Sequence, residues 1–237
     1  MAVPAAAPAR VLLLALLAAC DGMVVPYYRD PRIHSMGNGR LHAELAPAAT
    51  RLINAVSYGG RDVRREILDH HVRGTGTVVD LACGVGMSTS DGALGIDTSE
   101  DMIACARRRN GANASFEVGN AETWGEPLSY DVVTVFFALH EMPSCARRAV
   151  LRNAFRLAKK RVVVADIAPE KVPSRLMLAG EPFLVEYQHS IRSELAALTS
   201  HPSVRTARTV DLLPGHVLLC VIDLIRDPRA RPLGRSS

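Results

Sequence analysis

The segment from Val78 to Gly86 constrains the fold of this chain more than any other. It reads Val-Val-Asp-Leu-Ala-Cys-Gly-Val-Gly, an apolar run with one acid that leads into a turn of small residues. A short apolar run of this kind is typical of a buried strand. Gly84 and Gly86 let the backbone pass close to a ligand, and Asp80 adds a hydrogen-bond acceptor beside the turn. The segment therefore predicts a strand that leads into a nucleotide-type binding loop.

Strand-like and helix-like segments alternate after this motif. Strands are expected at 77–83, 93–97, 114–118, 130–139 and 161–167, and helices at 100–109, 146–159 and 174–198. Two more helices are expected before the motif, at 41–56 and 61–71. Pro47 should start or kink the first of them, because proline lacks the backbone N–H that a helix interior needs.

A hairpin is expected near the end of the chain, where 206–213 and 216–225 flank Pro214-Gly215. The alternation before it favours parallel strands joined by right-handed crossovers. We therefore predict the α/β class: a doubly wound, mostly parallel Rossmann-like sheet with a C-terminal antiparallel hairpin.

A second acid, Asp97, ends the next apolar segment, seventeen residues after Asp80 (97 − 80). An acid at the end of a second parallel strand is placed to bind a ribose diol. Thr98 follows it and opens a helix with acids in its first turn and arginines in its last. The alternative is that Asp97 serves only as an acid at a helix start.

With these residues the chain resembles the class I S-adenosylmethionine-dependent methyltransferases. Their first motif places an acid two residues before a small-Cys/Gly-Gly-x-Gly turn. Residues 130–143, which end in His140 and Glu141, resemble the fourth-strand motif of small-molecule methyltransferases. Residues 119–122, Gly-Asn-Ala-Glu, resemble the family's Gly-Asp-Ala-Glu segment.

The resemblance implies S-adenosylmethionine as the cofactor and a small-molecule acceptor. It implies that the glycine turn passes the methionine portion, that Asp80 lies near its amino group, and that Asp97 holds the ribose. Asn120 would meet the adenine, with a turn-forming role as the alternative. The full set of expected cofactor residues is Asp80, Ala82, Gly84, Gly86, Asp97, Thr98, Asn120, Ala121 and Phe137.

His140 and Glu141 are the candidate catalytic residues. They end the fourth strand, and ligands in open α/β sheets bind outside the carboxyl ends of strands. His140 has an ordinary pKa near neutrality, which suits a base that takes a proton from the acceptor. The alternative is that His140 only positions its loop, because methyl transfer often needs little beyond alignment.

Two segments are expected to cover the acceptor. Residues 27–34 supply Tyr28 and His34, and the helix after the fifth strand supplies Glu186 and Tyr187. The alternative for that helix is core packing, because four apolar side chains share one of its faces. These are Phe183, Tyr187, Ile191 and Leu195.

One departure from the family concerns the connection between the first two strands. Only residues 87–94 separate Gly86 from Gly95, which is too short for a full crossover helix. Two alternative functions follow: a non-catalytic methyltransferase-like fold with impaired cofactor binding, or an NAD(P)-dependent oxidoreductase. The oxidoreductase would place a third glycine at Thr89 and a helix directly after the turn.

Composition indicates one globular domain, because 237 residues with 48% hydrophobic content can bury a full core. The net charge is +4, but the densest basic runs, 107–109 and 159–161, fall at expected helix ends, so no nucleic-acid partner is expected. The five cysteines lack CxxC and Cys/His spacing, and no metal site is expected.

The amino terminus contains an apolar stretch, 11–19, after Arg10. It has the length of a signal-peptide core and is too short to span a bilayer, so no stable membrane insertion is expected. We divide the chain into a candidate signal or organelle-targeting segment (1–22), an N-terminal helical cap (23–59), a methyltransferase domain (60–228) and a disordered tail (229–237). A cytoplasmic chain that starts at Met23 is the alternative.

Overall fold

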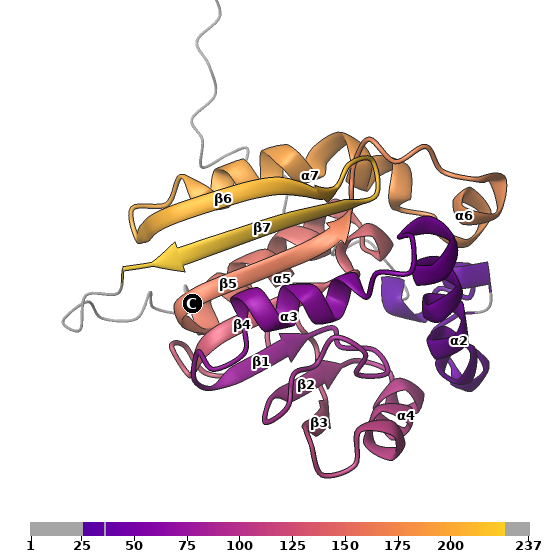
Figure 1. Ribbon diagram of the computed structural model, residues 1–237, viewed down its shortest axis with the longest axis horizontal. Coiled ribbons are helices and arrows are strands. Elements are labelled where there is room, and N and C mark those ends of the chain that lie inside the picture. Colours follow the sequence, from indigo (N-terminus) through magenta and orange to yellow (C-terminus); the bar gives the residue numbers. More distant parts are fainter. Residues whose placement is uncertain (1–25, 36, 226–237) are drawn as a thin grey trace, which may run out of the picture.

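The computed structural model describes residues 26–35 and 37–225, and the candidate targeting segment and tail lie outside this range. In the described part, one sheet has the strand order β3-β2-β1-β4-β5-β7-β6 (Figure 1). Its strands are β1 (Val78–Leu81), β2 (Leu94–Asp97), β3 (Ser115–Val118), β4 (Tyr130–Phe136), β5 (Ala158–Ile167), β6 (Val204–Leu213) and β7 (Val217–Leu224). The first five strands pair in parallel, and β7 is antiparallel to β5 and β6. The predicted fold class is confirmed.

Helices cover both faces of the sheet. In Figure 1, α3 lies in front of β1 and β4, whereas α5 and α7 lie behind the sheet, and α2 and α6 lie at its right-hand end. The α-helices are α2 (Arg40–Ser57), α3 (Val63–His71), α4 (Glu100–Asn110), α5 (Ser144–Leu157), α6 (Arg175–Gly180) and α7 (Leu184–Thr199). Short 3-10 turns occur at η1 (Tyr27–Arg29), η2 (Ile33–Ser35) and η3 (Leu139–Glu141).

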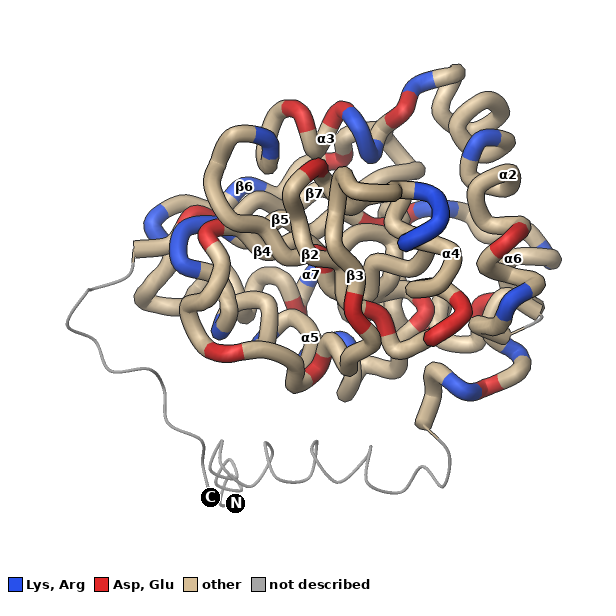
Figure 2. The backbone as a smooth tube through the Cα atoms, turned by 90° about the horizontal axis from the view of Figure 1, so that it is seen from below, with Lys and Arg blue, Asp and Glu red and all other residues tan. Residues whose placement is uncertain are grey.

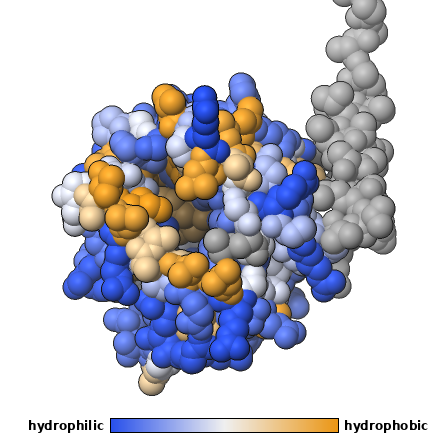
Figure 3. Space-filling view, turned by 90° about the vertical axis from the view of Figure 1, so that its right-hand side faces the viewer, coloured by the Kyte–Doolittle hydropathy of each residue, from blue (hydrophilic) through white to orange (hydrophobic). Residues whose placement is uncertain are grey.

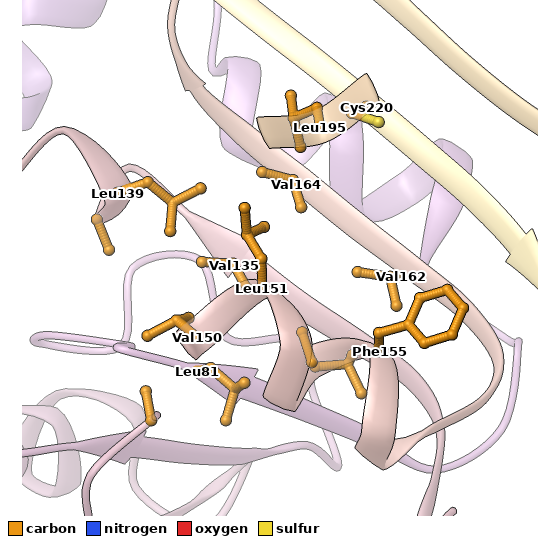
Figure 4. Packing of buried hydrophobic residues seen from close by; sticks show 14 of the residues in the cluster. Leu81, Val135, Leu139, Val150, Leu151, Phe155, Val162, Val164, Leu195 and Cys220 are labelled. Atoms are coloured by element: carbon orange, nitrogen blue, oxygen red, sulfur yellow. The ribbon is translucent and has the colours of Figure 1, made fainter. Parts of the chain in front are cut away.

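The alternation of side chains along β4 explains why both faces are apolar. Val132 and Phe136 pack in the cluster under α3, whereas Val133 and Val135 pack in the cluster with α5 and α7. Side chains two residues apart in a strand share a face, so a strand covered on both sides needs apolar side chains on both faces. Figure 4 shows Val135 in the second cluster, among side chains of α5. The two layers fix the carboxyl end of β4, where the candidate catalytic residues follow.

The helix expected at 174–198 is two helices. α6 ends at Gly180, and α7 begins at Leu184. Pro182 disfavours helical backbone at the residue before it, and Glu181 accordingly has φ −123° and ψ 83°. The break lets α6 contact η2, which carries His34.

α2 continues through Pro47, which was expected to start or kink it, and begins at Arg40. A proline inside a helix leaves the carbonyl four residues earlier without its usual N–H donor. Here that carbonyl belongs to Ala43, and the thiol of Cys105 in α4 donates to it at 3.4 Å. The cost of the proline is therefore reduced by a contact from another helix.

The short connection between β1 and β2, residues 82–93, contains no helix, yet the two strands pair in parallel. Its buried side chains replace part of the missing cover. Val85 packs with Ala43 of α2 and Met102 of α4, and the hydroxyl of Thr89 donates to the Asp80 carboxylate at 2.7 Å. The loop therefore packs on its own strand and on two helices in place of a crossover helix.

Gly86 should tolerate alanine much less well than Gly92 does. Both have φ +75°, but a Cβ at Gly86 would lie 2.5 Å from Asn110 and 2.8 Å from Phe116, whereas nothing lies within 4 Å at Gly92. Gly92→Ala carries only backbone strain, about 1–2 kcal/mol. Gly86→Ala should lower the free energy of unfolding by about 2 kcal/mol more. Urea unfolding of both variants measures the difference, and equal losses would contradict the tight packing at Gly86.

Candidate functional site

A cavity of about 910 Å³ opens at the carboxyl end of the parallel strands. Its walls come from the glycine turn after β1, the ends of β2 and β4, the segment 27–35, α2 and α6. Seven of the nine expected cofactor residues line it: Ala82, Gly84, Asp97, Thr98, Asn120, Ala121 and Phe137. The structure thus brings most of the predicted cofactor residues together around one hollow.

Asp97 lies where the glycine turn meets the start of α4. Its carboxylate accepts hydrogen bonds from the backbone N–H of Gly84 at 2.9 Å and of Ser99 at 2.9 Å. Burial raises the pKa of Asp97, and these backbone donors partly offset that rise. The bonds orient the carboxylate at the cavity wall.

Asp80 does not line the cavity. Its side chain is 1% exposed and accepts hydrogen bonds from the hydroxyls of Thr134 and Thr89, both at 2.7 Å. Burial raises its pKa to about 6. Gly86 also lies outside the cavity lining, packed against Phe116. Both residues support the glycine turn from the side away from the cavity.

Asn120 takes part in a turn and lines the cavity at the same time. Its side-chain oxygen accepts from the backbone N–H of Glu122 at 2.9 Å, and its carbonyl accepts from Thr123 and Trp124. Asn120 therefore forms the turn that the alternative interpretation expected. This turn leaves the Asn120 amide N–H₂ group as the donor that a ligand would meet.

His140 forms a buried pair with Asp166, the residue before the end of β5. The ring Nδ1 lies 2.6 Å from Asp166 Oδ1, and the backbone N–H of Leu139 donates to Asp166 Oδ2 at 2.8 Å. Burial lowers the pKa of His140, but the carboxylates of Asp166 and Glu141 outweigh it and raise the pKa to about 9. With Nδ1 engaged by Asp166, Nε2, which lies 3.8 Å from Glu141 Oε1, is the nitrogen that an acceptor could meet.

His34 joins three segments of the cavity wall. Its Nε2 lies 3.1 Å from Glu141, and its Nδ1 lies 2.8 Å from Glu181, at the end of α6. Burial lowers the pKa of His34, but the two carboxylates outweigh burial and raise this pKa to about 10. Burial raises the pKa of Glu141, but the interaction with His34 outweighs it and lowers that pKa. His34 has φ 54°, a left-handed backbone that is uncommon for histidine.

The expected acceptor residues divide into two pairs. Tyr28 and His34 line the cavity, whereas Glu186 and Tyr187 do not. Glu186 accepts from the backbone N–H of Ser144 at 3.3 Å and so caps the start of α5. Tyr187 is fully buried, and its hydroxyl donates to the Ile167 carbonyl at 2.5 Å. Tyr187 is therefore a core residue, as the alternative for this helix face expected.

The residues that the sequence prediction did not select include Arg64, His42 and Glu181 of the cavity lining and Asp166 of the His140 pair. Asp166 lies at the carboxyl end of a strand, so the rule that selected His140 also points to it. Arg64 sits in the helix before β1, with its guanidinium 3.9 Å from the Phe137 ring centre. Glu181 belongs to a segment that was expected to cover the acceptor, although Glu186 and Tyr187 were selected from it instead, and His42 belongs to the helix expected at 41–56, to which no site role was given.

The His34 ion pairs predict a loss of stability above neutral pH. The pKa of His34 is about 10 in the folded chain and near 6.5 ordinarily, so the folded state binds this proton more tightly. Its contribution is complete below about pH 6.5 and is lost as the pH rises toward 10. Urea unfolding should show a loss of at least about 1 kcal/mol from pH 7 to pH 10. His34→Asn should reduce this dependence to the part that His140, with a pKa of about 9, contributes over the same range. The exposed control His189→Asn should keep all of it, and an unchanged slope in His34→Asn would contradict the assignment.

Charge, membrane and metal features complete the description. In Figure 2, Lys and Arg are spread among Asp and Glu along the part of the tube that is described. Within residues 26–35 and 37–225, no helix combines the length and apolarity needed to cross a bilayer. The same residues contain no group of three or more His, Cys, Asp or Glu arranged to hold a metal ion.

Comparison with known proteins gives one family match and a shared fold. Residues 78–161 match the model of the family described as "Methyltransferase domain", and no curated protein matches the chain. A TehB-like SAM-dependent methyltransferase from Corynebacterium glutamicum has a TM-score of 0.54 and 16% identity, over 78% of this chain and 99% of that one. A SAM-dependent methyltransferase from Aquifex aeolicus has a TM-score of 0.52 and 16% identity, over 69% and 90%.

A third structure, phosphoethanolamine N-methyltransferase 2 of Haemonchus contortus in complex with S-adenosyl-L-methionine, has a TM-score of 0.62. It is 12% identical, over 86% of this chain and 61% of that one. The methyltransferase-domain model thus matches residues 78–161, and these SAM-dependent methyltransferases share the fold of this chain. The methyltransferase domain implies S-adenosylmethionine as the cofactor, as the sequence motifs predicted.

Proposed function

We propose that this chain transfers a methyl group from S-adenosylmethionine to a small-molecule acceptor. The observation that supports this most is the cavity of about 910 Å³ at the carboxyl end of the sheet. Its size is within the range of small-molecule and cofactor sites. A fold that had lost cofactor binding would be expected to fill this crevice with side chains.

The residues present fit the cofactor. No atom lies within 4 Å of a Cβ built on Gly84, so a ligand can approach the turn there. Asp97 would hold the ribose hydroxyls, and Asn120 would meet the adenine. Ala82, Thr98, Ala121 and Phe137 would form the walls, while Asp80 and Gly86 would support the turn from outside.

The chemistry asked of the protein is alignment and removal of one proton. S-adenosylmethionine, when bound, supplies a methyl group that is already activated for in-line displacement. The acceptor oxygen or nitrogen forms a bond to the methyl carbon, the carbon–sulfur bond breaks with its electron pair left on sulfur, and the acceptor loses a proton. His140 Nε2 would take that proton, while Asp166 holds the ring through Nδ1.

The high pKa of His140 is compatible with this role. A neutral imidazole is needed to accept a proton, and the pKa of about 9 describes the protein without a cation in the cavity. A positive charge bound nearby lowers the pKa of a histidine, because two like charges repel. His140 is therefore expected to act as a base only when the site is loaded.

Two measurements test the proposal. Titration with S-adenosylhomocysteine should raise the melting temperature, whereas NAD and NADP should not. Incubation with S-adenosylmethionine and a metabolite extract should then give products that are heavier by about 14 Da in mass spectrometry, because each methylation adds a net CH₂. Cofactor binding with no methylated product would favour the non-catalytic alternative, and stabilisation by NAD would favour the oxidoreductase.

A further inference from the structure

An apolar collar surrounds the mouth of the cavity. It consists of Leu45 and Ile53 of α2, Val172 before α6 and Leu176 within α6. These side chains are 47%, 46%, 85% and 79% exposed, yet all four line the cavity. Figure 3 shows hydrophobic residues gathered around a hollow on the face that carries α2 and α6. Exposed apolar surface of this kind marks a site where an apolar ligand or partner binds.

The apolar collar continues into the interior. Ala46 and Ala49 of α2 and Met177 of α6 extend it inward, and Ile33 and Tyr58 lie beyond them. The residues expected to hold the cofactor line the same cavity around the glycine turn. The cavity is therefore lined both by these residues and by apolar side chains of α2 and α6.

Two buried polar atoms of residues that line the cavity lack hydrogen-bond partners. Among the described residues, Glu181 Oε2 and His42 Nδ1 are buried without a hydrogen bond, although both residues line the cavity. The other Glu181 oxygen is engaged by His34. Buried polar groups are normally paired, and a carboxylate oxygen can only accept. Glu181 is therefore placed to receive an O–H or N–H donor from a ligand.

We infer that the acceptor is an amphipathic small molecule, with a hydroxyl or amine that donates to Glu181 and an apolar body that extends through the apolar collar. This inference rests on the proposed function and names its substrate class. A carboxylate head group is disfavoured at this position, because an ionised carboxylate has no hydrogen to donate to Glu181 Oε2 and would be repelled by that oxygen.

The test uses two homologous series, n-alkylamines and n-alkanols from butyl to decyl, as probes at concentrations where they do not form aggregates. Calorimetric titration into the full chain, saturated with S-adenosylhomocysteine, measures their affinity. Burial of a methylene is worth up to about 4-fold in affinity when it is complete. We expect at least a 3-fold gain for every two methylenes, and at least 10-fold weaker binding of n-alkanoates of equal length.

Paired variants locate the effect. Val172→Gln combined with Leu176→Gln should abolish the dependence on chain length and leave the affinity for S-adenosylhomocysteine within about 2-fold. The matched control is Val185→Gln combined with Ile225→Gln. These residues are 50% and 56% exposed, and neither lines the cavity. The control should keep the full chain-length dependence.

Several outcomes would overturn the inference. Affinity that does not grow with chain length, equal binding of alkanoates, or a collar variant that behaves like the control would each do so. A collar variant that changes only the oligomeric state by sedimentation, or only binding to phosphatidylcholine vesicles, would assign the collar to a second copy or to a membrane instead. S-adenosylhomocysteine binding without chain-length dependence defeats this inference alone, whereas no S-adenosylhomocysteine binding defeats the proposed function.

Discussion

Replacement of Asp97 by asparagine should lower the affinity for S-adenosylhomocysteine by at least about 100-fold. The reason is that the hydrogen bonds from the two ribose hydroxyls to the charged Asp97 carboxylate would be lost or weakened. Both carboxylate oxygens already accept from backbone N–H groups, those of Gly84 and Ser99. An asparagine would turn a second N–H donor toward one of them and would remove the charge. The ribose would lose its acceptor, and the glycine turn would lose one of its fixed points.

The control for this change is Glu100→Gln. Glu100 lies in the first turn of the helix that follows Asp97, and it does not line the cavity. The Glu100→Gln variant should bind S-adenosylhomocysteine with an affinity within about 2-fold of that of the unchanged protein. This control separates a local effect at Asp97 from a general loss of negative charge near the start of α4. Binding by Asp97→Asn within 3-fold of the unchanged protein would show that this carboxylate does not hold the cofactor.

Replacement of His140 by glutamine should lower kcat by about 10²–10⁴-fold, the usual range for a lost general base, once an acceptor has been found. The affinity for S-adenosylhomocysteine should change by less than about 3-fold, because the cofactor wall is untouched. A kcat within 5-fold of the unchanged enzyme would support the alternative in which His140 only positions its loop.

Asp166→Asn tests the pairing of Asp166 with His140, and its first measurement needs no acceptor. The Asp166 carboxylate raises the pKa of His140, and an amide at that position would not. The pKa of His140, followed by NMR titration, should fall from about 9 by at least about one unit. The pH dependence of kcat should move in the same direction. An unchanged titration would contradict the pairing of the two residues.

The sheet and the cofactor wall were predictable because they depend on short-range patterns. A strand, a glycine turn and an acid at the next strand end are read within twenty residues, and parallel pairing then brings Gly84 and Asp97 together. His140 followed from the rule that ligands meet the carboxyl ends of strands. The break between α6 and α7 was also readable, since Pro182 lies in the sequence where the helix stops.

The remaining features depend on contacts between distant segments. The helix through Pro47 is helped by a thiol from Cys105, 62 residues from the carbonyl that it bonds. The buried position of Asp80 depends on its register opposite Thr134, which no local pattern specifies. Tyr187 shares a helix face with core residues, and only the packing of α7 shows that its hydroxyl points to the Ile167 carbonyl rather than to the cavity.

Calorimetric titration of the full chain with S-adenosylhomocysteine tests the central claim most directly, because the connection between β1 and β2 lacks the helix that would ordinarily support the cofactor. The account predicts one site with a dissociation constant on the order of micromolar, about −8 kcal/mol of binding free energy. The absence of measurable heat and of any thermal stabilisation at millimolar ligand would contradict it.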